Sequence, residues 1–223
     1  MNVFYLDKDP VKAAQMSCDK HVVKMILESA QLLSTCHRVL DGVEYYGKTA
    51  NGRKIKRWKH PNSNYEQILY KAGWVKHPST IWLFESAYNY MWLYKHMMAL
   101  NDQYKKRYNH TKDHVAIQKL GVILSEPPKN AKINKIATDP QPAMPDECKV
   151  PGDAVQSYRN YYVMKKRRSK RDQRSYWHLM DHTPEMPQLW SVSQMKRDLI
   201  SKSWGIGKDQ SLRIIFGKFQ EKK

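Results

Sequence analysis

The chain has 223 residues, of which 41% are hydrophobic and 27% charged, a composition typical of a folded globular protein. Its 39 Lys and Arg residues outnumber the 21 Asp and Glu residues, and the resulting formal net charge of +18 favours a polyanionic partner such as nucleic acid. The mean hydropathy of −0.78, the absence of an apolar run of about 20 residues and the three unclustered cysteines argue against a membrane protein, a disulfide-linked secreted domain and a cysteine-based zinc site.

Two long helices are predicted in the first half of the chain. Residues 3–6 form a short extended N-terminal arm. Asp9-Pro10 then supplies an N-cap and a first-turn proline for a helix over residues 10–40. His77-Pro78 begins a second helix over about residues 79–107, whose broad apolar face indicates a central core helix.

The other segments differ in composition. Residues 43–64 predict a basic, aromatic loop in which Asn51-Gly52 favours a hairpin turn. Residues 125–153 contain six prolines, which exclude regular structure from most of that span and predict an ordered loop or a linker. We therefore predict a mainly α fold, a single helical domain with a core over residues 1–124, the proline-rich loop, and a basic helical region over residues 154–223 that packs on the core.

A dense basic run follows near the end of the chain. Seven cations lie close together there and repel one another unless a polyanion neutralises them, so we expect contacts to nucleic-acid phosphates. The alternative is a solvated helix end. The seven residues are Lys165, Lys166, Arg167, Arg168, Lys170, Arg171 and Arg174.

Cations and aromatic side chains also alternate after the first helix. Aromatic faces can stack unpaired bases while cations hold the backbone. In the alternative interpretation Trp58 and Trp74 are core anchors. The two His-Pro turns add free N–H groups at predicted helix starts, which suit phosphates. The predicted nucleic-acid contacts of this region are Arg53, Lys54, Lys56, Arg57, Trp58, His60, His77 and Ser79.

One face of the first helix carries candidate catalytic residues. His21, Lys24 and Glu28 are spaced i, i+3 and i+7, so their side chains point the same way, and Lys20 lies one turn from Lys24. Neighbouring positive charges favour a neutral amine or imidazole, which can act as nucleophile or base. The alternative is an ordinary surface helix with a weak Lys24–Glu28 pair. We predict a catalytic centre of these four residues, with no metal and no cofactor.

The opening segment, MNVFYLDKDP followed by CDKHVVKMILESAQLL, resembles a set of uncharacterised T4-like phage proteins. More distantly, residues 1–110 are similar to the phage pyrimidine-dimer DNA glycosylase/AP lyase family of the endonuclease V type. That resemblance implies an all-α fold that kinks duplex DNA and extrudes a base. It also implies attack of an N-terminal α-amino group on the sugar C1′, assisted by a Glu and two Arg. The best local match to that cluster is Lys20 to Lys24, in which His21 replaces the Glu.

These observations predict a nucleic-acid-binding phage protein of the host-cell cytoplasm, with DNA favoured over RNA and no membrane association. The favoured activity is a DNA-acting enzyme that excises or modifies an extruded base. One alternative is a non-catalytic protein that binds DNA, RNA or a host protein. Another is an enzyme acting on free nucleotides, which would show little dependence on salt.

Overall fold

A computed structural model describes residues 2–133 and 137–165, which all belong to the first of two compact units of the chain, Met1–His182. Helices make up most of these residues, and the only two strands among them form one antiparallel hairpin. The prediction of a mainly α fold is therefore confirmed.

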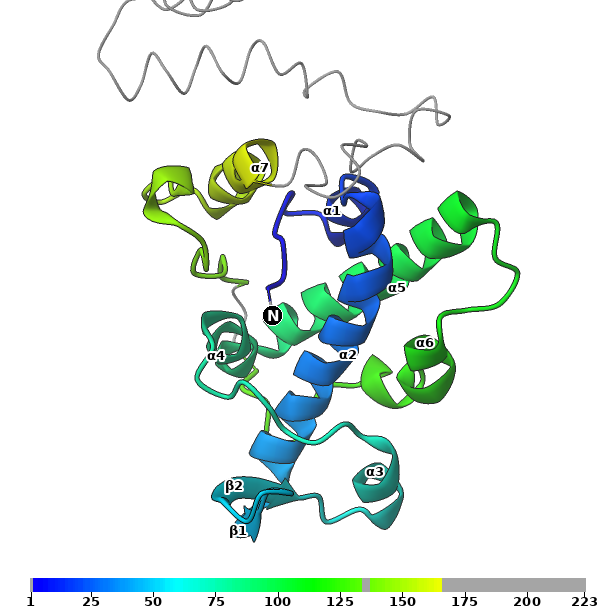
Figure 1. Cartoon of the computed structure of the whole chain (residues 1–223), viewed down its shortest axis with the longest axis vertical. Helices are drawn as coiled ribbons and strands as arrows, with labels where there is room; N and C mark the ends of the chain where they lie inside the picture. The colour runs from blue at the N-terminus through cyan, green and yellow to red at the C-terminus, as the bar shows by residue number, and fades with distance from the viewer. Residues whose placement is uncertain (1, 134–136, 166–223) are drawn as a thin grey trace, which may run out of the picture. The chain divides into compact units, whose positions relative to one another are not determined.

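Two long helices form the core of this unit. Helix α2 (Asp19–Asp41) packs against α5 (Ala87–Tyr108), which it crosses in Figure 1. Ile26 of α2 and Leu93 and Leu100 of α5 are completely buried. The core fixes the direction of α2, whose other face carries the polar side chains.

Both predicted long helices are interrupted. The first is divided into α1 (Pro10–Gln15) and α2, with a break after Met16. The second is divided into α4 (Pro78–Glu85) and α5 at Ser86, which has extended backbone angles and caps α5 by accepting a hydrogen bond from the Tyr88 N–H. The prediction of continuous helices was therefore wrong at these two points, because a new cap begins a new helix direction.

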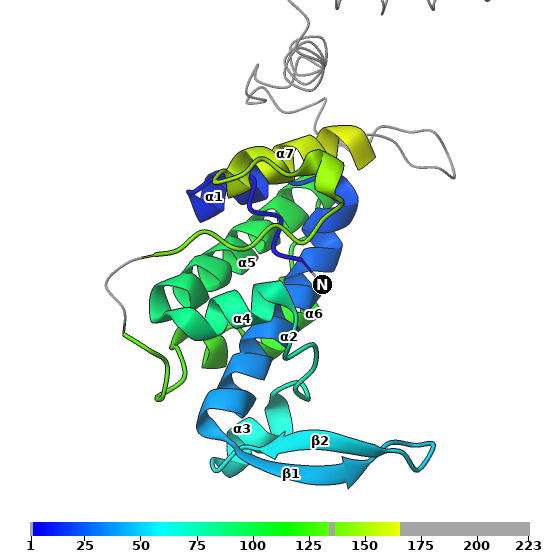
Figure 2. The same cartoon turned by 90° about the vertical axis from the view of Figure 1, so that its left-hand side faces the viewer.

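A β-hairpin follows α2 directly and extends away from the helices (Figure 2). It consists of β1 (Val43–Lys48) and β2 (Lys54–Lys59), and its turn contains Gly52 at a φ of 74°, as the Asn-Gly pair predicted. A Cβ atom at Gly42 would lie 2.3 Å from the Arg38 carbonyl oxygen, so this close passage from helix to strand requires glycine. Helix α3 (Ser63–Ile68) comes next.

The start of the chain is packed against a late helix. Val3 to Leu6 are all buried, and Arg159 of α7 (Ala154–Lys165) donates from Nε to the Leu6 carbonyl at 2.8 Å. The predicted extended N-terminal arm is thus an integral part of the fold. Helix α6 (Val115–Leu120) and 3₁₀ turns over Ile123–Ser125 and Asp146–Cys148 complete the described elements.

The proline-rich loop is tied down on the helices. The Trp82 indole N–H donates to the Thr138 carbonyl at 2.7 Å, and the Thr138 N–H donates to the Asn89 side chain at 3.1 Å. Near its start, the amides of Lys129 and Asn130 donate to the Asp41 carboxylate, both at 2.9 Å. The described parts of this segment therefore form an ordered loop rather than a linker.

Candidate nucleic-acid interface

The polar side of α2 forms a single line of side chains, spaced by three or four residues and therefore on one face of the helix. Exposure falls along this line: the side chain of Lys24 is 68% exposed, that of Glu28 15% and that of Arg38 4%. One end is thus open to solvent, whereas the other is covered by later parts of the chain. We call this line the polar stripe; its members are Lys20, Lys24, Glu28, Gln31, Thr35 and Arg38.

His21 lies beside the polar stripe in a buried aromatic cluster. Its ring is only 8% exposed and stacks on Phe4, with the ring centroids 4.1 Å apart. Its Nδ1 atom is 2.5 Å from the Tyr162 hydroxyl oxygen of α7. Among the four predicted catalytic residues, His21 therefore has a packing position that links the N-terminal arm and α7 to α2, while Lys20 and Lys24 are exposed.

Glu28 lies where the polar stripe approaches the start of α4. Its Oε1 atom is 3.1 Å from Nζ of Lys24. His77 is the N-cap of α4, and its Nδ1 accepts the Ser79 N–H at 3.2 Å. The pKa of His77 is lowered mainly by burial and further by the positive charge of the N-terminus, whereas the Glu28 carboxylate opposes this effect. The Glu28 carboxylate and its paired amine therefore lie within electrostatic range of the His77 imidazole.

Arg38 holds the covered end of the polar stripe together. Its guanidinium donates to the carbonyl oxygens of Trp58, Glu66, Leu69 and Tyr70 and to the Glu66 carboxylate, over distances of 2.5 to 3.2 Å. The planar group with five donors suits this arrangement, since nearly all of its N–H groups find acceptors. One buried side chain thus attaches both the hairpin and the segment after α3 to α2.

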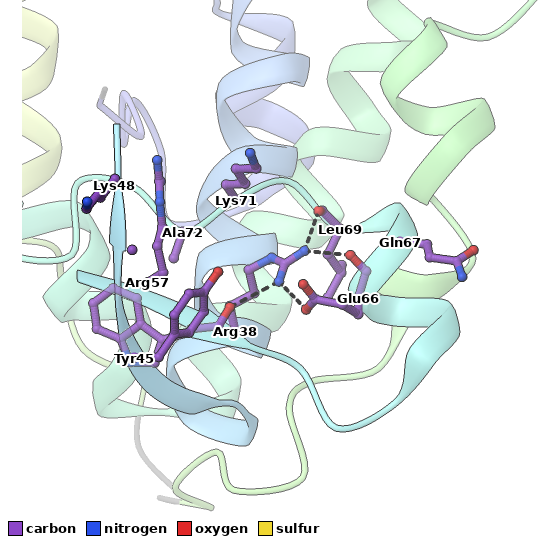
Figure 3. A pocket seen from close by; sticks show the side chains of 11 residues that line it. Arg38, Tyr45, Lys48, Arg57, Glu66, Gln67, Leu69, Lys71 and Ala72 are labelled. Carbon is purple, nitrogen blue, oxygen red and sulfur yellow. Dashed lines mark hydrogen bonds and ion pairs between the residues drawn. The ribbon is translucent and has the colours of Figure 1, made fainter. Parts of the chain in front are cut away.

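A cavity of about 370 Å³ opens beside this attachment, between the hairpin and the segment after α3 (Figure 3). Figure 3 shows Arg38 bonded to Glu66 on one side of it, with Tyr45 and Arg57 on the other. Its lining combines cations, aromatic rings and one carboxylate, which suits an anionic ligand with a flat ring, such as a nucleotide. These residues are Lys48, Arg57, Lys71, Tyr45, Trp58 and Glu66.

The hairpin carries most of the nucleic-acid contacts that were predicted between the two long helices. Arg53 and Lys54 are exposed next to the turn, and Nζ of Lys54 lies 4.1 Å from the centroid of the Tyr46 ring. Lys56 is also exposed but is paired with Glu44 across the strands at 2.9 Å. The hairpin is therefore a cationic ribbon that projects from the end of α2.

Two other predicted contacts do not reach the surface. His60 is 5% exposed and Ser79 is completely buried. Their burial leaves no room for a phosphate, so the helix start at Ser79 acts through packing. The predicted basic run lies outside the described residues: α7 is described up to Lys165, whose side chain is not, and the other six cations lie beyond it.

One largely buried cluster has the side-chain types and the spacing that could hold a metal ion. It consists of His37, Asp41 and His60, whose possible ligand atoms all lie within 4.8 Å of one another. Nδ1 of His60 accepts the Asn62 N–H at 3.1 Å, which leaves the ring proton on Nε2, the atom that faces Asp41 at 4.0 Å. A metal ion at Nε2 would have to displace this proton and would cost the hydrogen bond that Nδ1 accepts. We therefore interpret the cluster as a structural link between the end of α2 and the hairpin.

The structure decides between the two interpretations of Trp74, a core anchor or a surface on which a base could stack. Its side chain is 64% exposed, so it is not a core anchor. Trp58, by contrast, is partly buried and lines the cavity. No local pattern distinguishes the two tryptophans, because their exposure depends on how the segment folds back over α2.

The family model described as pyrimidine dimer DNA glycosylase matches residues 1–115, which is more than half of the chain. The chain therefore belongs to this family, and the predicted similarity to phage pyrimidine-dimer glycosylases is confirmed. The match includes the polar stripe, the hairpin and His77. No curated protein and no solved structure matches the chain. None of the helices in the described residues is both long and apolar enough to cross a membrane.

Proposed function

We propose that this protein is a DNA glycosylase with AP lyase activity. The observation that carries the proposal is that the family match covers the segment in which the paired Lys24 and Glu28 lie within electrostatic range of His77. In the proposed reaction an amine attacks C1′ of the sugar, and the base leaves with the electrons of the glycosidic bond. The amine then gives up protons as the C1′–O4′ bond breaks, O4′ becomes a hydroxyl, and an imine forms. The Glu28 carboxylate would stabilise the positive charge that develops on the sugar and accept a proton.

Two amines could act as the nucleophile. Lys24 is well exposed and already contacts Glu28. The α-amino group of the N-terminus is the second, since the resemblance to the glycosylase family implies attack by such an amine. The buried position of His21 argues against its use as the base and supports Glu28 in that role.

The proposed DNA path runs from Lys24, at the open end of the polar stripe, over the segment that covers the other end of the stripe, to the hairpin. Lys24 and Arg38 are fourteen positions apart, which corresponds to about 21 Å of helix, or about six base pairs of duplex. The hairpin cations and the cavity would hold phosphates at one end while chemistry takes place at the other. Counterion release should make this binding strongly dependent on salt.

A borohydride trapping experiment on duplex DNA with one abasic site tests the proposal directly. Borohydride reduces an imine to a stable amine, so the full-length protein should become covalently linked to the DNA. Peptide mapping of the adduct would then identify Lys24 or the N-terminal amine. The absence of any adduct, with DNA binding intact, would instead support the non-catalytic alternative.

The Glu28→Gln variant tests the carboxylate. Turnover on abasic DNA should fall by about 10²- to 10⁴-fold, the usual contribution of a positioned acid or base, while binding of the same DNA is kept. Glu126→Gln, which changes an exposed carboxylate, serves as the matched control and should behave like the wild type. Equal turnover in both variants would contradict the assigned role.

We also propose the host-cell cytoplasm as the place of action and DNA rather than RNA as the partner. Cys18, Cys36 and Cys148 are all buried and form no disulfide in the described part of the chain, which is compatible with a reducing compartment. Competition between DNA and RNA oligonucleotides of the same sequence tests the choice of partner.

A further inference from the structure

The backbone at Trp74 has a conformation that a bulky residue rarely adopts. Its φ angle is 56°, in the left-handed region that glycine and asparagine favour. The indole is nevertheless 64% exposed, so burial of the ring does not compensate for this strain. Strained residues of this kind tend to occur where a side chain must be presented in a particular direction.

The strained backbone is held on both sides by hydrogen bonds. The Trp74 carbonyl accepts the His77 N–H at 2.8 Å and the Thr80 hydroxyl at 2.9 Å. The preceding residue, Gly73, donates its N–H to Oγ1 of Thr35, a buried member of the polar stripe, at 3.2 Å. The backbone that carries the exposed ring is therefore fixed by hydrogen bonds to both α2 and α4. We call this hydrogen-bonded backbone of Gly73 and Trp74 the mount of the ring.

The surroundings of Trp74 indicate what would cover it. Its ring lies 6.4 Å from that of His77, at 90°, and His77 in turn feels the charge of Glu28. Lys71 and Lys76, both exposed, belong to the same segment. A flat apolar face with cations nearby is complementary to a nucleobase on a phosphate backbone.

We infer that Trp74 is a stacking residue for an unpaired nucleobase, held beside the polar stripe next to His77. This inference rests on the proposed DNA-acting function. The ring would stack on a base that is unpaired in single-stranded DNA or has lost its partner in a duplex. Because the backbone at Trp74 is already fixed, the side chain loses less conformational entropy when a base stacks on it. This gain explains why the strained conformation is kept.

Binding of fluorescent oligonucleotides to Trp74 variants tests this inference. The probes are a single strand, an intact duplex and a duplex with one abasic site. Trp74→Ala should weaken binding of the single strand and the abasic duplex by about 5- to 150-fold and affect the intact duplex less. Trp74→Phe should retain most of the affinity, and Tyr88→Ala, which removes another half-exposed ring on α5, should leave it unchanged.

A stability measurement separates stacking from a structural role. Trp74→Gly relieves the backbone strain, so its Tm should rise by about 2–4 °C while its affinity for the single strand falls as in Trp74→Ala. Unchanged affinity in Trp74→Ala, or an equal loss in Tyr88→Ala, would overturn the inference. If Arg57→Gln weakens binding while Trp74→Ala does not, the proposed function stands and only the inference fails. Failure of the wild type to bind any of the probes would refute the proposed function itself.

Discussion

The hairpin and the segment of residues 69–77 both attach to the polar stripe, but they hold their exposed groups differently. The hairpin presents cations on a two-stranded ribbon that Arg38 attaches at its base. The other segment presents one ring, Trp74, on a backbone bonded to Thr35 and Thr80. Charge attraction acts over several ångströms and tolerates motion, whereas stacking needs a defined plane. One helix face thus holds two different kinds of exposed group, and each suits a different kind of contact with a nucleic acid.

Removal of Arg38 should affect both regions at once and have the largest effect. Arg38→Met leaves the Glu66 carboxylate and several carbonyl groups without their donor, so the free energy of unfolding should fall by about 3–5 kcal/mol. Urea unfolding measures this change. Arg53→Met, which removes an exposed cation at the hairpin turn, is the control and should shift stability by less than about 0.5 kcal/mol. A small effect for Arg38→Met would mean that the two regions are attached independently of it.

Low pH should loosen the base of the hairpin. Burial, with the neighbouring His60, lowers the pKa of His37 to about 4, although Asp41 opposes this. Below pH 6.5, His37 binds a proton in the unfolded chain but not in the folded protein. The free energy of unfolding therefore keeps its full value above pH 6.5 and decreases as the pH falls towards 4. The loss should reach about 3 kcal/mol.

Urea unfolding at several pH values between 7 and 4 measures this loss. His96, whose pKa is lowered to about 3 by burial, should contribute in the same direction, so the informative comparison is between variants. His37→Phe should flatten the pH dependence, whereas His110→Gln, which changes an exposed ring, should not. Identical pH profiles for His37→Phe and the wild type would contradict the assignment.

Much of the fold and part of the site follow from local patterns. The helical period predicted that Lys20, Lys24 and Glu28 share one face of α2, and Asn51-Gly52 predicted the hairpin. The covering of the stripe was not predictable, since Arg38 binds mostly backbone carbonyl groups, which every residue has. The burial of His21 depends on Tyr162, which is 141 positions away, and no local signal reports such a contact.

A smaller effect, on DNA binding, is expected when one cation of the hairpin is removed. Arg57→Gln removes a cation from the cavity wall and should weaken DNA binding several-fold, by similar factors for all sequences. The slope of log K against log salt should decrease in magnitude by about 0.9, the value for one lost phosphate contact. The matched control is Lys12→Gln on α1, which precedes the first turn of α2, whereas the hairpin follows its last turn. An unchanged slope would show that Arg57 contacts no phosphate.

The smallest effect is expected from Thr80→Val, which changes the mount of Trp74 but not its ring. The variant keeps the shape of the side chain and loses the hydrogen bond from Oγ1 to the Trp74 carbonyl, so the free energy of unfolding should fall by about 1 kcal/mol. Binding of single-stranded DNA should weaken a few-fold because the ring is less well oriented, while the salt slope stays the same. Thr111→Val, at an exposed position, should change neither quantity. If Thr80→Val lowered the salt slope as Arg57→Gln does, the two regions would not be separate kinds of contact, and the distinction between a charged ribbon and a fixed ring would fail.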